Sequence, residues 1–197
     1  MKTVILGSGR GTNAEAIIHA QSNQLLGNAE VHAIFSDNED SGILKVAESN
    51  NIDGYYVDGG PLKTKFDEQS ERVWIEKIMK SEPDLIVLAG FMRVLKPAFI
   101  KAFNGAIVNL HPSLLPSFKG LRAIERALEY GVKISGCSVH WVSEEIDSGK
   151  IIGQVPVRIM EGDTIEMVSQ KIHAAEHMLL PSVIRSLSIG AVLFPEA

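Results

Sequence analysis

The feature that most constrains the fold is an apolar run at residues 84–90, which reads Asp-Leu-Ile-Val-Leu-Ala-Gly without polar alternation. A strand that is apolar on both faces is typical of the centre of a parallel sheet covered by helices on both sides. Further apolar runs lie at residues 3–6, 29–35 and 105–108. Helical patterns separate these runs. The alternation predicts an α/β fold: an open, mostly parallel twisted sheet with helices on both faces, in one domain over residues 1–197.

The remaining elements follow from spacing and from local signals. Helices are expected at about 12–20, 42–49, 66–79, from 97, at 121–130 and from 164, with further strands near 55–57, 132–142 and 151–159. Thr12 and Glu15 have the form of a capping box, which predicts where the first helix starts. Gly131 is placed to cap the helix before it. Pro181 is expected to kink the last helix, because proline cannot donate to the carbonyl of His177.

Composition limits the possible partners. The chain has 197 residues, 45% of them hydrophobic, and a formal net charge of -5. It lacks a long basic run, so we expect no nucleic-acid partner. No apolar stretch approaches a membrane span, and the single cysteine, Cys137, excludes an intrachain disulfide. We therefore expect a cytoplasmic protein with small-molecule partners and no membrane association, either a monomer or a homodimer.

A glycine-rich loop joins the first strand to the first helix. Glycines at 7, 9 and 11 allow a tight turn, so the N–H groups of Gly11, Thr12 and Asn13 are expected to point at an anion such as a phosphate. Thr12 stands where a dinucleotide-binding fingerprint has Gly or Ala, and the loop lacks the Gly-Lys-Ser/Thr ending of a P-loop. The alternative is a turn that binds nothing. Asp37, after the second strand, either accepts from a ribose hydroxyl or forms an Asx turn.

An amide and an imidazole mark the end of the strand near residue 108. Asn109 and His111 are two residues apart, so both side chains point to one face, and Pro112 favours the extended conformation that keeps them there. An amide can donate to a developing oxyanion and an imidazole can move a proton. The alternative is a structural turn. The apolar loop at residues 91–95 leaves the neighbouring strand, and it is either a slot for a flat ring or part of the core.

Five segments together resemble the motifs of folate-dependent formyltransferases. They lie at residues 9–13, 89–95, 109–116, 136–140 and 147–149. The resemblance covers almost the whole chain and is closest to the phosphoribosylglycinamide formyltransferases. It implies a Rossmann-like formyltransferase fold and an enzyme of one-carbon metabolism that needs no metal. Such a transferase moves the formyl group of 10-formyltetrahydrofolate, its folate co-substrate, to the amine of 5-phosphoribosylglycinamide in de novo purine (IMP) biosynthesis.

The resemblance also implies residue roles. The catalytic residues would be Asn109, His111 and Asp147. The nucleotide substrate would be bound by Gly11, Thr12, Asn13 and Glu176. The folate would be bound by Met92, Arg93, Val94, Leu95 and Asn109. The N-terminal half would thus hold the substrate phosphate, and the C-terminal half the folate and the catalytic groups. His140 either supports the catalytic network or is a hydrogen-bonded strand histidine.

The implied chemistry agrees with these residue types. Amine attack on a formyl carbonyl gives a tetrahedral oxyanion, to which Asn109 and protonated His111 can donate. Asp147 beside the imidazole would favour its protonated form. One departure concerns the folate glutamate tail: the family often has an arginine after Phe-x-Ser, whereas Gln69 and Arg72 are the nearest candidates here.

The sequence leaves other classes of function open. Residues 173–177 match the H-x-x-E-H pattern of zinc proteases. Formyl transfer to methionyl-tRNA would need an RNA-binding appendage, and formyltetrahydrofolate hydrolysis would be expected to bring an N-terminal regulatory domain. A nucleotide-binding module without catalysis is a further class.

Overall fold

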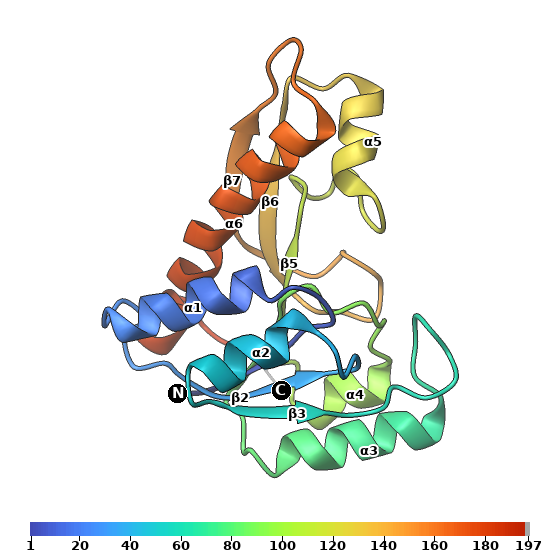
Figure 1. Ribbon diagram of the computed structural model, residues 1–197, viewed down its shortest axis with the longest axis vertical. Coiled ribbons are helices and arrows are strands. Elements are labelled where there is room, and N and C mark those ends of the chain that lie inside the picture. Colours follow the sequence, from blue (N-terminus) through green and yellow to red (C-terminus); the bar gives the residue numbers. More distant parts are fainter. Residues whose placement is uncertain (196–197) are drawn as a thin grey trace.

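A computed structural model describes residues 1–195, which form one seven-stranded sheet with helices on both faces (Figure 1). The strands are β1 (Lys2–Leu6), β2 (Glu30–Ser36), β3 (Asp53–Tyr56), β4 (Leu85–Leu88), β5 (Ile107–His111), β6 (Ile134–Trp141) and β7 (Ile151–Arg158). The helices are α1 (Thr12–Ser22), α2 (Gly42–Ser49), α3 (Glu68–Met79), α4 (Pro97–Ala102), α5 (Ala123–Tyr130) and α6 (Ile165–Ser188). The strand order is β3-β2-β1-β4-β5-β6-β7, and this confirms the expected open α/β sheet.

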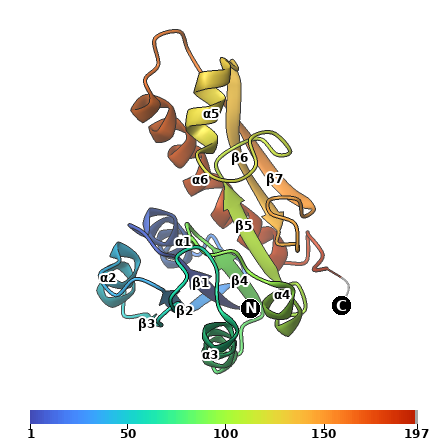
Figure 2. The same ribbon diagram turned by 90° about the vertical axis from the view of Figure 1, so that its right-hand side faces the viewer.

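The sheet is buried on both faces at its centre. In β1, Val4 and Leu6 belong to one hydrophobic cluster and Ile5 to the other, because successive side chains of a strand point to opposite faces. Helices α1, α2 and α6 contribute to the cluster around Ile5, and α3 and α4 to the cluster around Val4. Figure 2 shows α1 and α2 on one side of the sheet and α3 and α4 on the other. The unbroken apolar run of β4 follows from this double cover.

The sheet changes direction after β5. Strands β1 to β5 pair in parallel, whereas β6 runs antiparallel to both β5 and β7. The register opposes Asn109 to His140 and His111 to Ser138. Figure 1 shows β6 and β7 extending with α6 away from the parallel strands. The polar end of β5 therefore lies beside the polar residues of β6.

One helix cap and two helix starts differ from the sequence expectation. The capping box was wrong: Gly11 is the N-cap of α1 with φ 86°, Thr12 is the first helical residue, and no side chain caps the helix. Helix α3 begins at Glu68, because the side chain of Asp67 caps it by accepting from the Ser70 N–H. Phe66, expected as the first helical residue, is fully buried in the core. Helix α5 begins at Ala123 rather than near residue 121.

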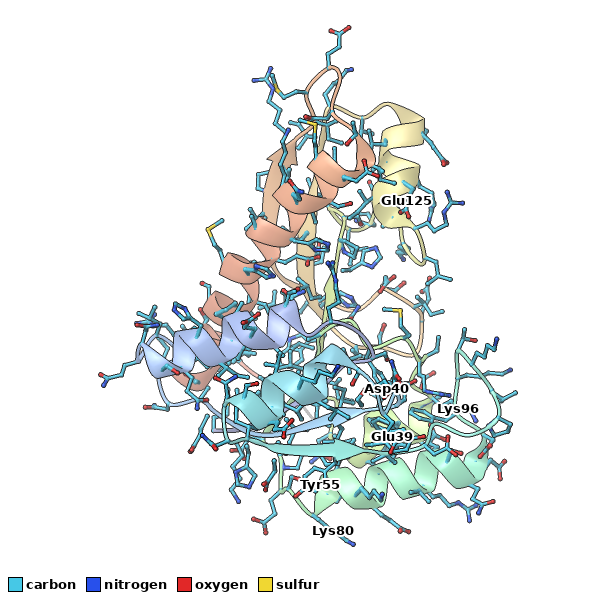
Figure 3. All side chains as sticks on the ribbon, viewed as in Figure 1. Glu39, Asp40, Tyr55, Lys80, Lys96 and Glu125 are labelled. Carbon is cyan, nitrogen blue, oxygen red and sulfur yellow. The ribbon has the colours of Figure 1, made fainter. Side chains whose placement is uncertain are left out.

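The expected cap at Gly131 and the expected start of the last helix near Thr164 are confirmed. Gly131 caps α5 with φ 82°, and Thr164 accepts a hydrogen bond from the Met167 N–H at the start of α6. Pro181 is buried inside α6, which continues past it to Ser188, and the kink expected there stays a prediction. Within residues 1–195, no helix is long and apolar enough to cross a membrane. Lys80, after α3, is exposed and extends away from the sheet in Figure 3.

Candidate functional site

The strand β5 ends in a cluster of four polar side chains. Asn109 Nδ2 lies 3.3 Å from Asp147 Oδ1 and 3.2 Å from His140 Nε2. The other oxygen of Asp147, Oδ2, lies 3.3 Å from His111 Nδ1. Since β5 and β6 supply the amide and the two rings, their register brings together groups that are far apart in sequence. The structure thus unites the three residues expected to be catalytic, together with His140.

Both ring nitrogens of His111 face acceptors. Nδ1 faces the Asp147 carboxylate, and Nε2 lies 3.0 Å from the carbonyl oxygen of Phe118. Neither neighbour can donate, so only a doubly protonated ring satisfies both contacts. The side chain of His111 is 7% exposed. These two contacts orient the ring at the position from which the sequence predicts proton transfer.

His140 is held by the backbone of its own strand. Its Nδ1 donates to the Trp141 carbonyl at 2.8 Å, which leaves Nε2 free to accept from Asn109 in the neutral ring. When protonated, Nε2 can instead donate to Asp147 Oδ1, 3.5 Å away. His140 is 2% exposed and contacts two of the predicted catalytic residues. These contacts are compatible with support of the catalytic network and with a hydrogen-bonded strand histidine, so the role of His140 stays a prediction.

Asp147 is ionised by its surroundings. Burial by itself raises the pKa of Asp147, but hydrogen bonds from His140 and from the Gly120 N–H, together with the charge of His111, outweigh it and lower the pKa below its ordinary value. The Gly120 N–H donates to Oδ2 at 2.8 Å. A buried carboxylate between two imidazoles is therefore held as an anion.

The backbone around Asp147 explains the Asp-Ser-Gly sequence. Asp147 has φ 50°, a left-handed conformation that short polar residues tolerate better than most others. A Cβ at Gly149 would collide with the carbonyl oxygen of Trp141. Glycine is therefore required where the turn between β6 and β7 packs against the last residue of β6. This turn directs the Asp147 carboxylate into the site.

Several supporting groups had no clear signal in the sequence. The Ser138 hydroxyl donates to the Ser113 carbonyl at 2.6 Å, and it accepts from the Leu115 N–H at 3.0 Å and from Gln154 at 2.8 Å. These bonds fix the loop after β5 against β6. Ser138 and His140 are two residues apart on β6 and so share a face, but nothing in the sequence indicates the partners of Ser138. The Phe118 carbonyl and the Gly120 N–H were likewise missed, since backbone groups leave no residue pattern.

The glycine-rich loop lies against α6. Gly11 has no room for a side chain, because a Cβ there would lie 2.7 Å from the Cα of Ile43. Asn13 Nδ2 donates to Glu176 Oε2 at 3.1 Å, and His173 Nδ1 lies 2.9 Å from the same oxygen. The hydrogen bond to Glu176 raises the pKa of His173, while burial and the charge of Arg10 oppose the shift. The loop and the predicted substrate residue Glu176 thus form one cluster.

Within residues 92–95, the segment expected to bind folate, the side chain of Arg93 forms a buried ion pair. Met92 and Val94 are 58% and 41% exposed, whereas Leu95 is buried. Arg93 Nε donates to Asp37 Oδ2 at 2.6 Å, and both of these side chains are about nine-tenths buried. Asp37 therefore pairs with Arg93, a contact that neither the ribose nor the Asx interpretation foresaw.

The proposed tail residues lie on α3. Gln69 is exposed, and Arg72 lies 3.9 Å from Glu68 on the same helix. Across residues 1–195, no three or more histidine, cysteine, aspartate and glutamate side chains are grouped so that they could hold a metal ion. In the H-x-x-E-H segment, Glu176 contacts His173 and Asn13.

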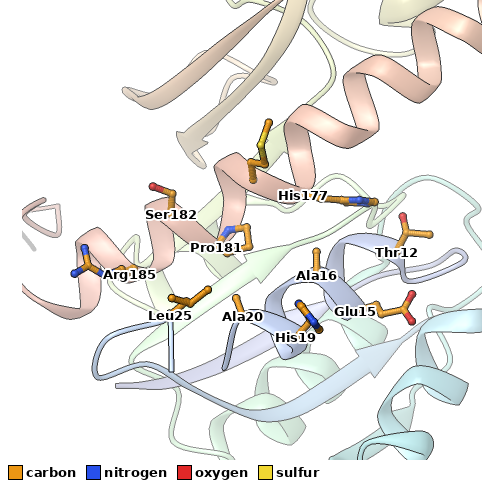
Figure 4. A pocket seen from close by; sticks show the side chains of 11 residues that line it. Thr12, Glu15, Ala16, His19, Ala20, Leu25, His177, Pro181, Ser182 and Arg185 are labelled. Carbon is orange, nitrogen blue, oxygen red and sulfur yellow. The ribbon is translucent and has the colours of Figure 1, made fainter. Parts of the chain in front are cut away.

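A groove of about 770 Å³ runs between α1 and α6 (Figure 4). Ala16 and Pro181 contribute to its apolar lining, and Thr12 and His177 lie together at one end in the picture. The Nε2 atom of His177 is buried without a hydrogen-bond partner in the described part of the chain. The groove adjoins the glycine-rich loop, whereas Asn109, His111 and Asp147 are not among its lining residues.

Comparison with known proteins finds similarity to formyltransferases. The formyl transferase family model matches residues 1–184. The phosphoribosylglycinamide formyltransferase of Bacillus subtilis is 36% identical over 186 residues, which covers 94% of each chain. That of Escherichia coli is 36% identical over 197 residues, covering 100% of this chain and 91% of the relative.

The chain is also similar to part of a longer protein and to a solved structure. The trifunctional purine biosynthetic protein adenosine-3 of Gallus gallus is 40% identical over 199 residues, and the match spans only 19% of that protein. The crystal structure of glycinamide ribonucleotide transformylase 1 from Symbiobacterium toebii has a TM-score of 0.92 at 35% identity. It covers 99% of this chain and 91% of that one.

Proposed function

The chain belongs to the formyl transferase family, and we propose that it transfers the formyl group of 10-formyltetrahydrofolate to the primary amine of 5-phosphoribosylglycinamide. The products are the N-formyl nucleotide and tetrahydrofolate. The observation that carries the mechanism is the position of Asp147, within 3.3 Å of both Asn109 Nδ2 and His111 Nδ1. The Asp147 carboxylate thus contacts both Asn109, the proposed donor to the oxyanion, and His111, the proposed proton carrier.

Bond formation precedes bond breaking in this reaction. The substrate amine attacks the formyl carbon, a C–N bond forms and the carbonyl oxygen becomes an oxyanion. Asn109 and protonated His111 donate to that oxygen, and each such donor contributes about 10²–10³ in rate. The Nε2–H of His111 is bonded to the Phe118 carbonyl in the structure. The formyl oxygen must therefore displace Phe118 to receive this donor.

Collapse of the intermediate moves one proton. The attacking amine loses a proton, and the folate nitrogen gains one as its bond to the formyl carbon breaks. His111 carries this proton directly or through water, and the ionised Asp147 stabilises the imidazolium while it does so. The proposed reaction needs no metal, because side chains stabilise the oxyanion and transfer the proton.

The two substrates bind to opposite parts of the site in this proposal. The backbone N–H groups of Gly11, Thr12 and Asn13 hold the phosphate at the start of α1, and Glu176 contacts the nucleotide. Residues 92–95 line the folate slot, with Asn109 between the substrates. One domain thus divides into a phosphate-binding N-terminal half and a C-terminal half that holds the catalytic groups. Oligomeric state, cytoplasmic location and the glutamate-tail contact stay predictions.

A coupled assay tests the proposal. We expect 10-formyltetrahydrofolate to be consumed only when 5-phosphoribosylglycinamide is present, with one tetrahydrofolate formed for each nucleotide formylated. Consumption without the amine would identify a hydrolase instead. No consumption under either condition would favour the nucleotide-binding module.

A further inference from the structure

Arg93 links three separate parts of the chain that meet beside the predicted folate slot. Its Nε donates to Asp37 after β2, and its Nη1 donates to the carbonyl of Gly59 at 2.8 Å and to that of Lys65 at 3.2 Å. Nη1 also donates to the carbonyl of Leu62. We refer to residues 58–65 as the strap, because they cross from β3 towards α3 without regular structure.

The strap is joined directly to the segment that Arg93 belongs to. The Val94 N–H donates to the Thr64 carbonyl at 2.8 Å, and Lys65 and Val94 form an isolated parallel bridge. The guanidinium also lies over the ring of Phe66, 5.4 Å from its centroid. One side chain therefore holds the strap and residues 92–95 in a single arrangement.

Gly59 shows how closely the strap fits the guanidinium. A Cβ at position 59 would collide with the Cζ, Nη2 and Nε atoms of Arg93. The φ of Gly59 is not in the left-handed range, so any substitution acts through this collision and not through backbone strain. Only glycine at position 59 therefore leaves room for the Arg93 guanidinium where it lies.

We propose that Arg93 is a positioning residue for folate: its buried pair with Asp37 and its bonds to the strap hold the wall of the folate slot, while its side chain touches no substrate. This inference rests on the proposed function, because it takes residues 92–95 as the folate slot. It predicts that loosening Arg93 weakens folate binding and leaves nucleotide binding unchanged, since the strap pairs with Val94 and not with the glycine-rich loop.

Two variants separate positioning from stability. Arg93→Lys keeps a positive charge beside Asp37, so the carboxylate is not left without a cation, but one ammonium cannot reach the strap carbonyls as well. Gly59→Ala keeps both charged side chains, Arg93 and Asp37, and displaces the guanidinium from its place against the strap. Arg158→Lys, at an exposed position on β7, is the matched control.

In both variants we expect the KM for 10-formyltetrahydrofolate to rise by about tenfold or more, the effect of losing one charge-assisted hydrogen bond. The KM for the nucleotide and the kcat at saturating folate should stay within about twofold of the parent. Because both changes disrupt the same contact, their effects in the double variant should be smaller than the product of the single effects. Equal losses in all parameters, or an unchanged folate KM in folded protein, would overturn the inference.

Amide hydrogen exchange provides a readout that needs no activity. In Arg93→Lys the N–H of Val94 should exchange faster than in the parent and in Arg158→Lys, because its acceptor on the strap is no longer fixed. Unchanged exchange at Val94 contradicts the positioning role even if the parent proves to have another activity. An inactive parent with faster exchange at Val94 in Arg93→Lys would reject the proposed function and leave the contact itself intact.

Discussion

Asp147 Oδ2 lies 3.3 Å from His111 Nδ1, so a turn after β6 delivers a buried anion to the end of β5. The side chains of these two residues are 9% and 7% exposed, and water therefore does little to weaken their attraction. The contact orients the ring. The proposed transfer chemistry depends on this one relationship more than on any other in the molecule.

Removing the charge of Asp147 should affect catalysis more than folding. In Asp147→Asn we expect kcat to fall by about 10²–10³, because the imidazolium loses its counter-ion while the side-chain shape is kept. The measurement is the coupled transfer assay together with a thermal unfolding curve. Asp53→Asn, at an exposed position on β3, should leave kcat unchanged. A kcat within a few-fold of the parent in folded Asp147→Asn would exclude the role of the carboxylate.

The same carboxylate should make the fold sensitive to acid. The folded pKa of Asp147 is lowered, so its contribution to stability is present above the unfolded pKa of about 3.9 and is lost as pH falls through the folded pKa. The free energy of unfolding of the parent should therefore drop more steeply below pH 4 than that of Asp147→Asn. Denaturant titrations from pH 3 to pH 6 measure the difference. Parallel curves for the two proteins would contradict the lowered pKa.

His173 should titrate above the ordinary value for histidine. Its Nδ1 is held by Glu176, which raises its pKa, so the attraction is present at low pH and disappears as pH rises through the folded pKa of the ring. In Glu176→Gln the midpoint, followed by NMR of the ring protons, should move down towards about 6.5. Identical His173 midpoints in parent and variant would show that Glu176 does not set the charge of the ring.

The single thiol should be unreactive in the native protein. Cys137 is fully buried in β6, and burial, with the charge of Glu176, raises its pKa to about 12. Because the thiolate is the reactive form, alkylation by iodoacetamide at pH 8 should be more than about a hundredfold slower in native protein than in denaturant. Similar rates in the two conditions would show that β6 opens readily.

Much of the fold could be predicted from the sequence because burial leaves a periodic pattern. Residues 85–90 include no polar side chain, and Leu85–Leu88 form the buried strand β4. The start of α1 could not be predicted in the same way. The capping-box pattern at Thr12 is local, whereas the N-cap at Gly11 is set by its close approach to Ile43 on another helix. Tertiary contacts of this kind override local propensity.

The candidate site shows the same division. Asn109 and His111 could be placed on one face from their spacing alone, and the resemblance supplied Asp147. The Phe118 carbonyl that faces His111 could not be found, because any residue type supplies a carbonyl. The role of Arg93 was also hidden, since its partner Asp37 is 56 residues away in the chain.

The most direct test of the central claim is the rate of formyl transfer by His111→Asn under single-turnover conditions, with both substrates saturating. The account predicts a fall of about 10²–10³ in this rate, with nucleotide and folate affinities close to those of the parent, because the ring acts on the reacting atoms. A folded variant that transfers the formyl group within about tenfold of the parent rate would contradict the account.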